Sequence, residues 1–293
     1  MSPLEASLHA TTYVAGTTPG DRAQPDRWLF LLHGIFGTGK NWHSFAKELT
    51  ERRPDWGAVT VDLRKHGRSQ DAPPPHTIAA CAQDLLDLEE SLDLPIAGIS
   101  GHSFGGKVAL ATADLRARFG RGPFESVWIL DSDPTAAPQR VDEAASTQSA
   151  IAVLRILRSL PSLSFPSRTA FRDALGEHGI LRKVADWLGM NLRAEEDGGY
   201  RLAMDLDSLA ALLDNYLHLD QWELLADLPS TSSLHFVFGG RSTVLSAGLP
   251  DRVRGFDWGE RTATCDILAE AGHRLHVDDP QGLLARFESY LPR

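Results

Sequence analysis

The sequence has few of the features that mark secreted or membrane-spanning proteins. Only two cysteines occur in 293 residues, Cys81 and Cys265, far apart and outside any C-x-x-C pair. We therefore expect two ordinary thiols in a reducing compartment, not a disulfide or a metal pair. No apolar run approaches the ~20 residues that a membrane helix needs. The first fifteen residues lack the basic start and apolar core of a signal peptide, so a soluble cytoplasmic protein is the default expectation.

The sequence also lacks a cluster of lysine and arginine. Its formal net charge is −10. Nucleic acid and anionic membrane surfaces are therefore not expected as partners. A small-molecule substrate is expected instead. The length and the hydrophobic content of 42% suit one large α/β domain or two small ones with a sizeable core. The oligomeric state, monomer or homodimer, stays open.

Apolar runs alternate with helical patterns over most of the chain. Continuous apolar runs suit strands buried on both faces, and their alternation with helices predicts a parallel sheet covered on both sides. The edge segment Leu8–Val14 is expected to add an antiparallel strand. The predicted buried strands are Trp28–Leu32, Ala58–Val61, Ile96–Ile99, Ser126–Leu130, Leu234–Phe238 and Thr264–Leu268. The predicted helices between and after them are Trp42–Glu51, Ile78–Leu92, Lys107–Arg118 and Gln281–Tyr290.

This alternation breaks between Pro134 and Leu228. The segment has helical patterns and no convincing strand. It predicts an all-helical cap of residues 134–228 over a core of residues 1–133 and 229–293. Its expected helices are Val141–Leu160, Arg168–Leu175, Ile180–Leu188 and Leu206–His218.

The most informative motif is Gly101–Gly105, with the sequence GHSFG. It follows an apolar strand-like run and opens a helical one, which is the context of a G-x-S-x-G nucleophile elbow. Glycine two places before and two places after the serine permits the sharp turn. Ser103 is therefore the predicted nucleophile.

A serine nucleophile needs a base, and in enzymes with this elbow the histidine comes last in the chain. His273 follows the last predicted strand and precedes the last helix, so it is the predicted base. His276, three residues further on, is the competitor, and it is expected to point elsewhere.

The acid that orients the base is missing from its usual loop. Gly239–Thr243, after the penultimate predicted strand, has no carboxylate. The end of the strand before the cap does, and a carboxylate there lies on the same rim as the serine. We assign the acid to Asp131, with Asp133 as rival. Asp131 as a simple turn cap is the alternative, and Ser242 is a possible auxiliary partner of the imidazole.

The oxyanion donors are expected to be two backbone N–H groups. One belongs to Phe104, directly after the nucleophile, and the other to Ile35 or, second, Phe36. The predicted reaction is attack of Ser103 on an acyl carbonyl, with His273 taking the proton and water later releasing the acyl group. It needs no metal and no cofactor.

A second motif competes for the same loop. Gly34–Lys40, GIFGTGK, fits G-x-x-x-x-G-K after a strand and before a helix, which is nearly a phosphate-binding P-loop. The next residue is Asn41 where a magnesium-binding Ser or Thr is expected. A P-loop nucleotide hydrolase is therefore a remote alternative.

With these residues in view, the sequence resembles the α/β-hydrolases. The motifs that carry the resemblance are Leu32–Gly37, Val61–Ser69, Gly101–Lys107 and Ala271–His273, in the family's order and spacing. The resemblance covers nearly the whole chain. It implies the α/β-hydrolase fold: a mostly parallel central sheet flanked by helices, with a helical cap inserted after the sixth strand.

More narrowly, the chain resembles the YbfF-type esterases and their mitochondrial relatives. The features are Gly105–Lys107 (GGK), Gly239–Ser242 (GGRS) in place of an acid-bearing loop, and Asp205–Leu209 late in the cap. This resemblance implies a carboxylesterase-like enzyme that cleaves esters or thioesters of short-to-medium acyl chains. It also implies the acid at Asp131 and the serine at Ser242 near the histidine. Asp133 beside Asp131 departs from the pattern and leaves the choice of acid open.

Other chemistries use the same residues. Carbon–carbon bond hydrolases, acyltransferases and cofactor-free haloperoxidases keep the serine triad, so the sequence leaves them open. A non-catalytic binding module on the same scaffold would lack a working triad. The presence of Ser103, His273 and an acid candidate favours an enzyme, because function follows from the site and not from the fold.

Overall fold

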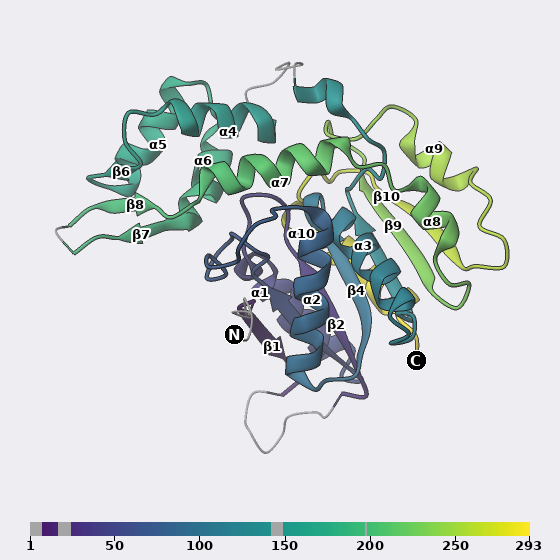
Figure 1. The fold of residues 1–293 in the computed structure, drawn as a ribbon. Helices are drawn as coiled ribbons and strands as arrows, with labels where there is room; N and C mark the ends of the chain where they lie inside the picture. Colours follow the sequence, from purple (N-terminus) through teal and green to yellow (C-terminus); the bar gives the residue numbers. More distant parts are fainter. Residues whose placement is uncertain (1–7, 17–24, 142–148, 197) are drawn as a thin grey trace.

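A seven-stranded sheet forms the centre of the molecule (Figure 1). The structure is a computed structural model that describes residues 8–16, 25–141, 149–196 and 198–293. The strand order is β1-β3-β2-β4-β5-β9-β10, with β1 antiparallel to β3 and every other pair parallel. The strands are β1 (Ala10–Tyr13), β2 (Arg27–Leu32), β3 (Trp56–Val61), β4 (Ile96–His102), β5 (Ser126–Leu130), β9 (Ser233–Gly239) and β10 (Ala263–Leu268).

The mostly parallel sheet and its antiparallel edge strand confirm the fold prediction. Every residue of β3 and β5 is buried, as expected of strands covered by helices on both faces. The edge strand β1 instead has two exposed residues, Thr11 and Thr12, and pairs on one side only.

Helices cover both faces of the sheet and create two apolar cores. Alternate residues of β2 point to opposite faces, so Phe30 and Leu32 join one core and Leu29 and Leu31 the other. The first core includes side chains of α2 (Ile78–Leu92), α3 (Phe104–Arg118), α8 (Trp222–Asp227) and α9 (Leu249–Arg254). The second includes side chains of α1 (His43–Arg52), α10 (Leu275–Asp278) and α11 (Pro280–Tyr290).

The strand order reverses direction between β2 and β4. From β2 the chain continues to β3 on one side of β2, and it later returns to place β4 on the other side. The loops that leave the carboxyl ends of β2 and β4 therefore diverge, and such a switch point is where open α/β sheets bind ligands. The loop after β2 begins at His33, and the turn after β4 holds Ser103.

The segment between β5 and β9, called here the insertion (residues 134–228), is not all-helical. It contains a small antiparallel sheet of order β6-β8-β7. The sequence gives no sign of these strands because each has only two or three residues, too few for an alternating pattern. The strands of the insertion are β6 (Ser164–Phe165), β7 (Leu192–Ala194) and β8 (Tyr200–Leu202).

The helices of the insertion match the predicted ones apart from their ends. Residues 142–148, part of the predicted helix Val141–Leu160, lie outside the described residues. Helix α8 packs against α3, beside the sheet, and was not predicted. The helices are η2 (Pro138–Val141), α4 (Ala150–Ser159), α5 (Arg168–Glu177), α6 (Arg182–Leu188), η3 (Gly189–Asn191), α7 (Leu206–His218) and α8.

The insertion follows the fifth strand in the order of the chain, not the sixth. The expectation was wrong because only one antiparallel strand, β1, precedes β2 in the described residues. Figure 1 shows α4 to α7 and β6 to β8 lying together beyond one end of the sheet. The division of the chain into a core and a cap at residues 134 and 228 stays a prediction.

The buried Lys107 ties the insertion to α3. Its Nζ donates to the carbonyl oxygens of Thr135 (3.1 Å), Tyr216 (2.8 Å) and Leu219 (2.6 Å). Two of these oxygens belong to the carboxyl-terminal end of α7, where the helix dipole favours a cation. Lys107 therefore holds the start of the insertion and the end of α7 at one point beside α3.

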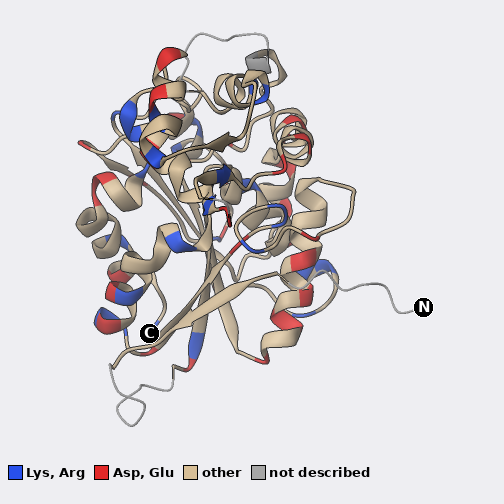
Figure 2. Ribbon diagram, turned by 90° about the vertical axis from the view of Figure 1, so that its left-hand side faces the viewer, with Lys and Arg blue, Asp and Glu red and all other residues tan. Residues whose placement is uncertain are grey.

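Charged residues lie mainly on the flanking helices and loops, and the central strands carry few of them (Figure 2). No helix within the described ranges is both long enough and apolar enough to span a bilayer.

Candidate active site

Ser103 stands on a strained turn between β4 and α3. Its φ of 53° and ψ of −118° are values that a non-glycine residue rarely adopts. A Cβ at Gly101 would collide with the carbonyl oxygen of Gly105, and one at Gly105 would lie 2.6 Å from the carbonyl oxygen of His33. The amide of Ser103 donates to the carbonyl of Leu130 at 2.9 Å. This bond holds the turn against the end of β5.

Asp131, the next residue along the chain after Leu130, contacts His273. The His273 Nδ1 lies 2.7 Å from Asp131 Oδ2. The Asp131 side chain is fully buried, whereas that of His273 is 32% exposed. Asp131 adopts a φ of 44°, which turns its side chain out of the strand direction. The structure thus brings together two of the residues that the sequence singled out.

Both oxygens of Asp131 are fully engaged. Ser242 Oγ donates to Oδ2 at 2.5 Å, and the amide of Gly239 donates to Oδ1 at 2.7 Å. With the Nδ1–H of His273, three donors face one buried carboxylate. Such hydrogen bonds fix the orientation of the carboxyl group. Ser242 lies in the loop after β9 where the sequence lacks a carboxylate. Within the described residues its hydroxyl hydrogen-bonds to the acid and not to the imidazole.

The rival residues lie elsewhere. Asp133 accepts from the amides of Thr135 and Ser246, both at 2.9 Å. Burial acts to raise the pKa of Asp133, but the hydrogen bonds from Ser246 and Thr135 outweigh it and leave the pKa below its ordinary value. The His276 ring packs on Trp42 with 4.4 Å between the ring centroids, and burial lowers its pKa to about 3.

His102, which precedes Ser103, was not singled out by the sequence. Its Nε2 donates to the carbonyl oxygen of His273 at 2.7 Å, and the two rings lie 4.6 Å apart. Burial lowers the pKa of His102 well below its ordinary value, so the ring is neutral at pH 7. The residue before the nucleophile therefore holds the backbone of His273. The signal that could have singled out His102 in the sequence is its position inside the elbow motif.

The loop after β2 presents Ile35 and Phe36 beside the elbow. The amide of Phe36 donates to His66 Nε2 at 3.3 Å. Within the described residues the amides of Ile35 and Phe104 have no hydrogen-bond acceptor. Phe104 is the first residue of α3, where N–H groups point away from the helix and attract negative charge. The backbone N–H groups of Ile35 and Phe104 are thus available to donate hydrogen bonds to a ligand.

Two buried neutral histidines support this loop. Burial lowers the pKa of His33 to about 4, and burial together with the nearby His33 lowers that of His66 to about 3. Each Nε2 accepts a backbone N–H, from Leu63 at 3.0 Å in the case of His33, so each Nδ1 carries the proton. That proton is donated to the carbonyl of Gly34 or of Arg64, both at 2.8 Å. This role was not predicted from the sequence.

The same loop does not form a phosphate-binding P-loop. A P-loop binds phosphate through its backbone N–H groups. Here the amide of Gly37 donates to the carbonyl of Gly34 (3.0 Å), that of Thr38 to Asn41 Oδ1 (2.7 Å) and that of Gly39 to Asp62 Oδ1 (2.7 Å). Three of the donors that a nucleotide phosphate requires are therefore already used.

The insertion supplies aromatic side chains to this region. Trp187 lies edge-on to Phe36 with 6.2 Å between centroids, and Tyr216 lies 5.9 Å from Phe104. Asn191 Nδ2 donates to the carbonyl of Phe36 at 2.9 Å. Phe36, which follows the open amide of Ile35, and Phe104 therefore both touch the insertion.

Comparison with known proteins places this geometry in a family. A model described as the Alpha/beta hydrolase family matches residues 29–286. The chain belongs to this family. The match spans β2 to α11 and includes Ser103, Asp131 and His273.

Two kinds of curated relative match most of the chain. The sn-1-specific diacylglycerol lipase ABHD11 of Danio rerio is 28% identical over 90% of this chain and 78% of its own length. The esterase YbfF of Escherichia coli is 27% identical over 90% of this chain and 92% of its own length. These matches confirm the predicted likeness to YbfF-type esterases.

Solved structures show the same fold. A marine microorganism esterase has a TM-score of 0.74 at 21% identity and covers 97% of this chain and 99% of its own. The E-2-(acetamidomethylene)succinate hydrolase has a TM-score of 0.69 at 19% identity, covering 92% of this chain and 93% of its own. At such identities the likeness concerns the fold alone.

Proposed function

We propose that the protein is a serine hydrolase that cleaves carboxylic esters or thioesters, with Ser103 as nucleophile, His273 as base and Asp131 as the residue that orients the base. The observation that carries the proposal is the 2.7 Å contact between His273 Nδ1 and Asp131 Oδ2. It lies at the ends of strands β4 and β5, beside the strained turn of Ser103. A buried carboxylate on Nδ1 leaves Nε2 to accept the serine proton.

The reaction proceeds in two halves. His273 takes the proton of Ser103 as its oxygen attacks the acyl carbonyl, and the protonated imidazole then gives that proton to the departing alcohol or thiol. Water, deprotonated by His273, attacks the acyl-enzyme and releases the acid and free Ser103. Asp131 stabilises the imidazolium in both halves, and Ser242 and Gly239 hold Asp131 in place.

The oxyanion of each tetrahedral intermediate is held by the amides of Ile35 and Phe104. The engagement of the Phe36 amide by His66 favours Ile35 as the donor from this loop. One such donor contributes about 2.7–4 kcal/mol to lowering the barrier. His33 and His66 keep the loop in place without adding a charge.

Ester hydrolysis is favoured over the other serine-triad chemistries by the names of the relatives, a diacylglycerol lipase and an esterase. We propose short-to-medium acyl chains that lie beside Trp187 and Tyr216 of the insertion, whose rings contact Phe36 and Phe104. A cytoplasmic location stays part of the proposal and rests on the two unpaired thiols, Cys81 and Cys265.

The test is hydrolysis of p-nitrophenyl esters and acyl thioesters of graded chain length by the wild type and by Ser103→Ala. We expect hydrolysis by the wild type and none above background by the variant, with the thermal midpoint preserved. Hydrolysis that survives in folded Ser103→Ala contradicts the nucleophile. An intact wild type that cleaves none of the esters, but transfers acyl groups between alcohols, favours an acyltransferase.

A further inference from the structure

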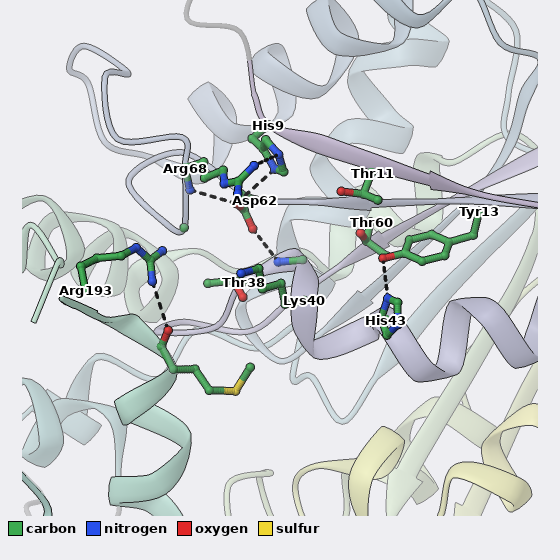
Figure 3. Close-up of a pocket in the computed structure, with 13 residues that line it drawn as sticks. His9, Thr11, Tyr13, Thr38, Lys40, His43, Thr60, Asp62, Arg68 and Arg193 are labelled. Carbon is green, nitrogen blue, oxygen red and sulfur yellow. Dashed lines mark hydrogen bonds and ion pairs between the residues drawn. The ribbon is translucent and has the colours of Figure 1, made fainter. Parts of the chain in front are cut away.

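A cavity of about 460 Å³ opens at the edge of the sheet, where β1 pairs with β3 (Figure 3). Its lining includes no residue proposed to act in catalysis. Three of its side chains carry a full positive charge: Lys40 from the loop after β2, Arg68 from the loop after β3, and Arg193 from β7 of the insertion. A volume of this size is within the range of small-molecule sites.

Within the described ranges none of these three cations forms an ion pair with a carboxylate. Arg68 Nη1 contacts His9 Nε2 at 3.2 Å, and Arg193 Nη1 donates to the carbonyl of Met190 at 3.3 Å. Several other arginines are paired with a carboxylate, as Arg64 is with Asp84 at 2.6 Å.

The single acid in the lining, Asp62, is already engaged. Its Oδ1 accepts the amide of Gly39 at 2.7 Å, and its Oδ2 accepts the amide of Arg68 at 2.9 Å and lies 3.4 Å from His9 Nδ1. Counting Asp62 against the three cations leaves the lining with two formal positive charges. The lining is therefore positively charged although the formal net charge of the protein is −10.

Figure 3 shows the arrangement: Arg68, His9 and Asp62 lie together, Arg193 enters from the insertion, and Tyr13, Thr60 and His43 lie further along. The Tyr13 hydroxyl contacts His43 Nδ1 at 3.1 Å. One end of the cavity thus offers charge, and the other offers hydroxyl and imidazole groups suited to a polar substituent.

We infer that this cavity binds a small phosphate monoester, with the phosphate between Lys40, Arg68 and Arg193 and the polar remainder toward Tyr13 and Thr60. A phosphate monoester carries about 1.5 to 2 negative charges at pH 7, which matches the excess. Guanidinium groups bind its oxygens through paired N–H donors. Side chains make this site, unlike a P-loop, so it needs neither the loop amides nor a magnesium ion.

Binding joins the core to the insertion, because Arg193 belongs to β7 whereas Lys40 and Arg68 belong to the core. The ligand is therefore expected to raise the thermal midpoint of the whole protein, since it binds only the folded chain.

Calorimetry of the full chain with sn-glycerol 3-phosphate, inorganic phosphate and malonate tests the inference. We expect saturable binding of glycerol 3-phosphate, weaker binding of inorganic phosphate, and none of malonate at the same concentrations. Lys40→Gln, Arg68→Gln and Arg193→Gln should each weaken binding of glycerol 3-phosphate about tenfold or more, and the exposed Lys183→Gln should not. Thermal midpoints of the free variants show that each one is folded.

Three results would overturn the inference. They are no saturable binding of either phosphate compound, binding that is equal in the three variants and the wild type, and tighter binding of malonate than of glycerol 3-phosphate. Because the readout is binding and not turnover, it is independent of the proposed ester hydrolysis.

Discussion

The core and the insertion use their polar groups in different ways. In the core, the polar groups of the site bond to one another, as Asp131 does with His273, Ser242 and Gly239. The insertion reaches the site through the half-buried aromatic rings of Trp187 and Tyr216, and through the Asn191 amide that donates to the carbonyl of Phe36. The difference indicates that the core performs the chemistry and the insertion shapes the space for the substrate. Changes in the core should then alter kcat or acid stability, and changes in the insertion should alter KM.

The largest effect is expected from Asp131→Asn. An amide at this position presents the wrong hydrogen-bonding groups to His273, and loss of such an orienter lowers kcat by about 10⁴-fold in a serine triad. Asp133→Asn is the matched control, because its oxygens accept backbone amides and not the imidazole. Steady-state kinetics on one ester compare the two. A larger loss in Asp133→Asn would mean that the acid is assigned to the wrong residue.

Ser242→Ala should have the next largest effect. It removes a hydrogen bond to the Asp131 carboxylate. Hydrogen bonds of this kind contribute about 1.5–3 kcal/mol, so kcat is expected to fall about 10- to 100-fold. The neighbouring, exposed Thr243→Ala serves as control. A value of kcat equal in Ser242→Ala and wild type would show that the serine is a bystander.

The loss of folding stability at low pH should arise mainly from residues of the core. Several histidines there have pKa values lowered by burial, among them His33, His66, His102, His235 and His276. The insertion histidines, His178 and His218, are exposed.

Since the folded pKa values lie below the unfolded value of about 6.5, only the unfolded chain binds protons just below that pH. The contribution of these histidines to the free energy of unfolding is fully present above about pH 6.5 and is lost as the pH falls toward 4. The loss is about 1.4 kcal/mol per pH unit for each buried histidine.

Denaturant unfolding between pH 7.5 and 4.5 measures this slope. His235→Asn, remote from Ser103, should reduce the slope by about 1.4 kcal/mol per pH unit, because burial lowers the pKa of His235 to about 4. His178→Asn should leave the slope unchanged. Equal slopes in the two variants would contradict the assignment.

The smallest effect is expected from Trp187→Ala in the insertion. Loss of a half-buried ring against Phe36 removes apolar contact of about 1–2 kcal/mol, so KM for longer acyl chains should rise several-fold while kcat changes little. The exposed Leu181→Ala is the control within the insertion. A fall in kcat in Trp187→Ala as large as that in Ser242→Ala would contradict the assignment of chemistry to the core and of substrate space to the insertion.

The sequence predicted the core well because its signals are local. Apolar runs such as Ser126–Leu130 are long enough to indicate buried strands, and the elbow at Ser103 is a contiguous motif with a steric cause. The match to the family model and the solved structures confirms this part of the prediction.

What the sequence did not predict depends on contacts between distant residues. Strands β6 to β8 have too few residues to show a pattern, and they form only because they pair with one another. The roles of His33, His66 and His102 require knowing which backbone group each ring meets. The assignment of Asp131 rested on its place at the end of a predicted strand and on the family resemblance, and it stayed open because Asp133 lies two residues away on the same rim.

The most direct test of the central claim is labelling with a fluorophosphonate, followed by peptide mapping. The account predicts one adduct, on Ser103, that is absent in Ser103→Ala and forms far more slowly in His273→Ala. An adduct on another residue, or a rate in His273→Ala equal to that of the wild type, would contradict a Ser103 nucleophile activated by His273.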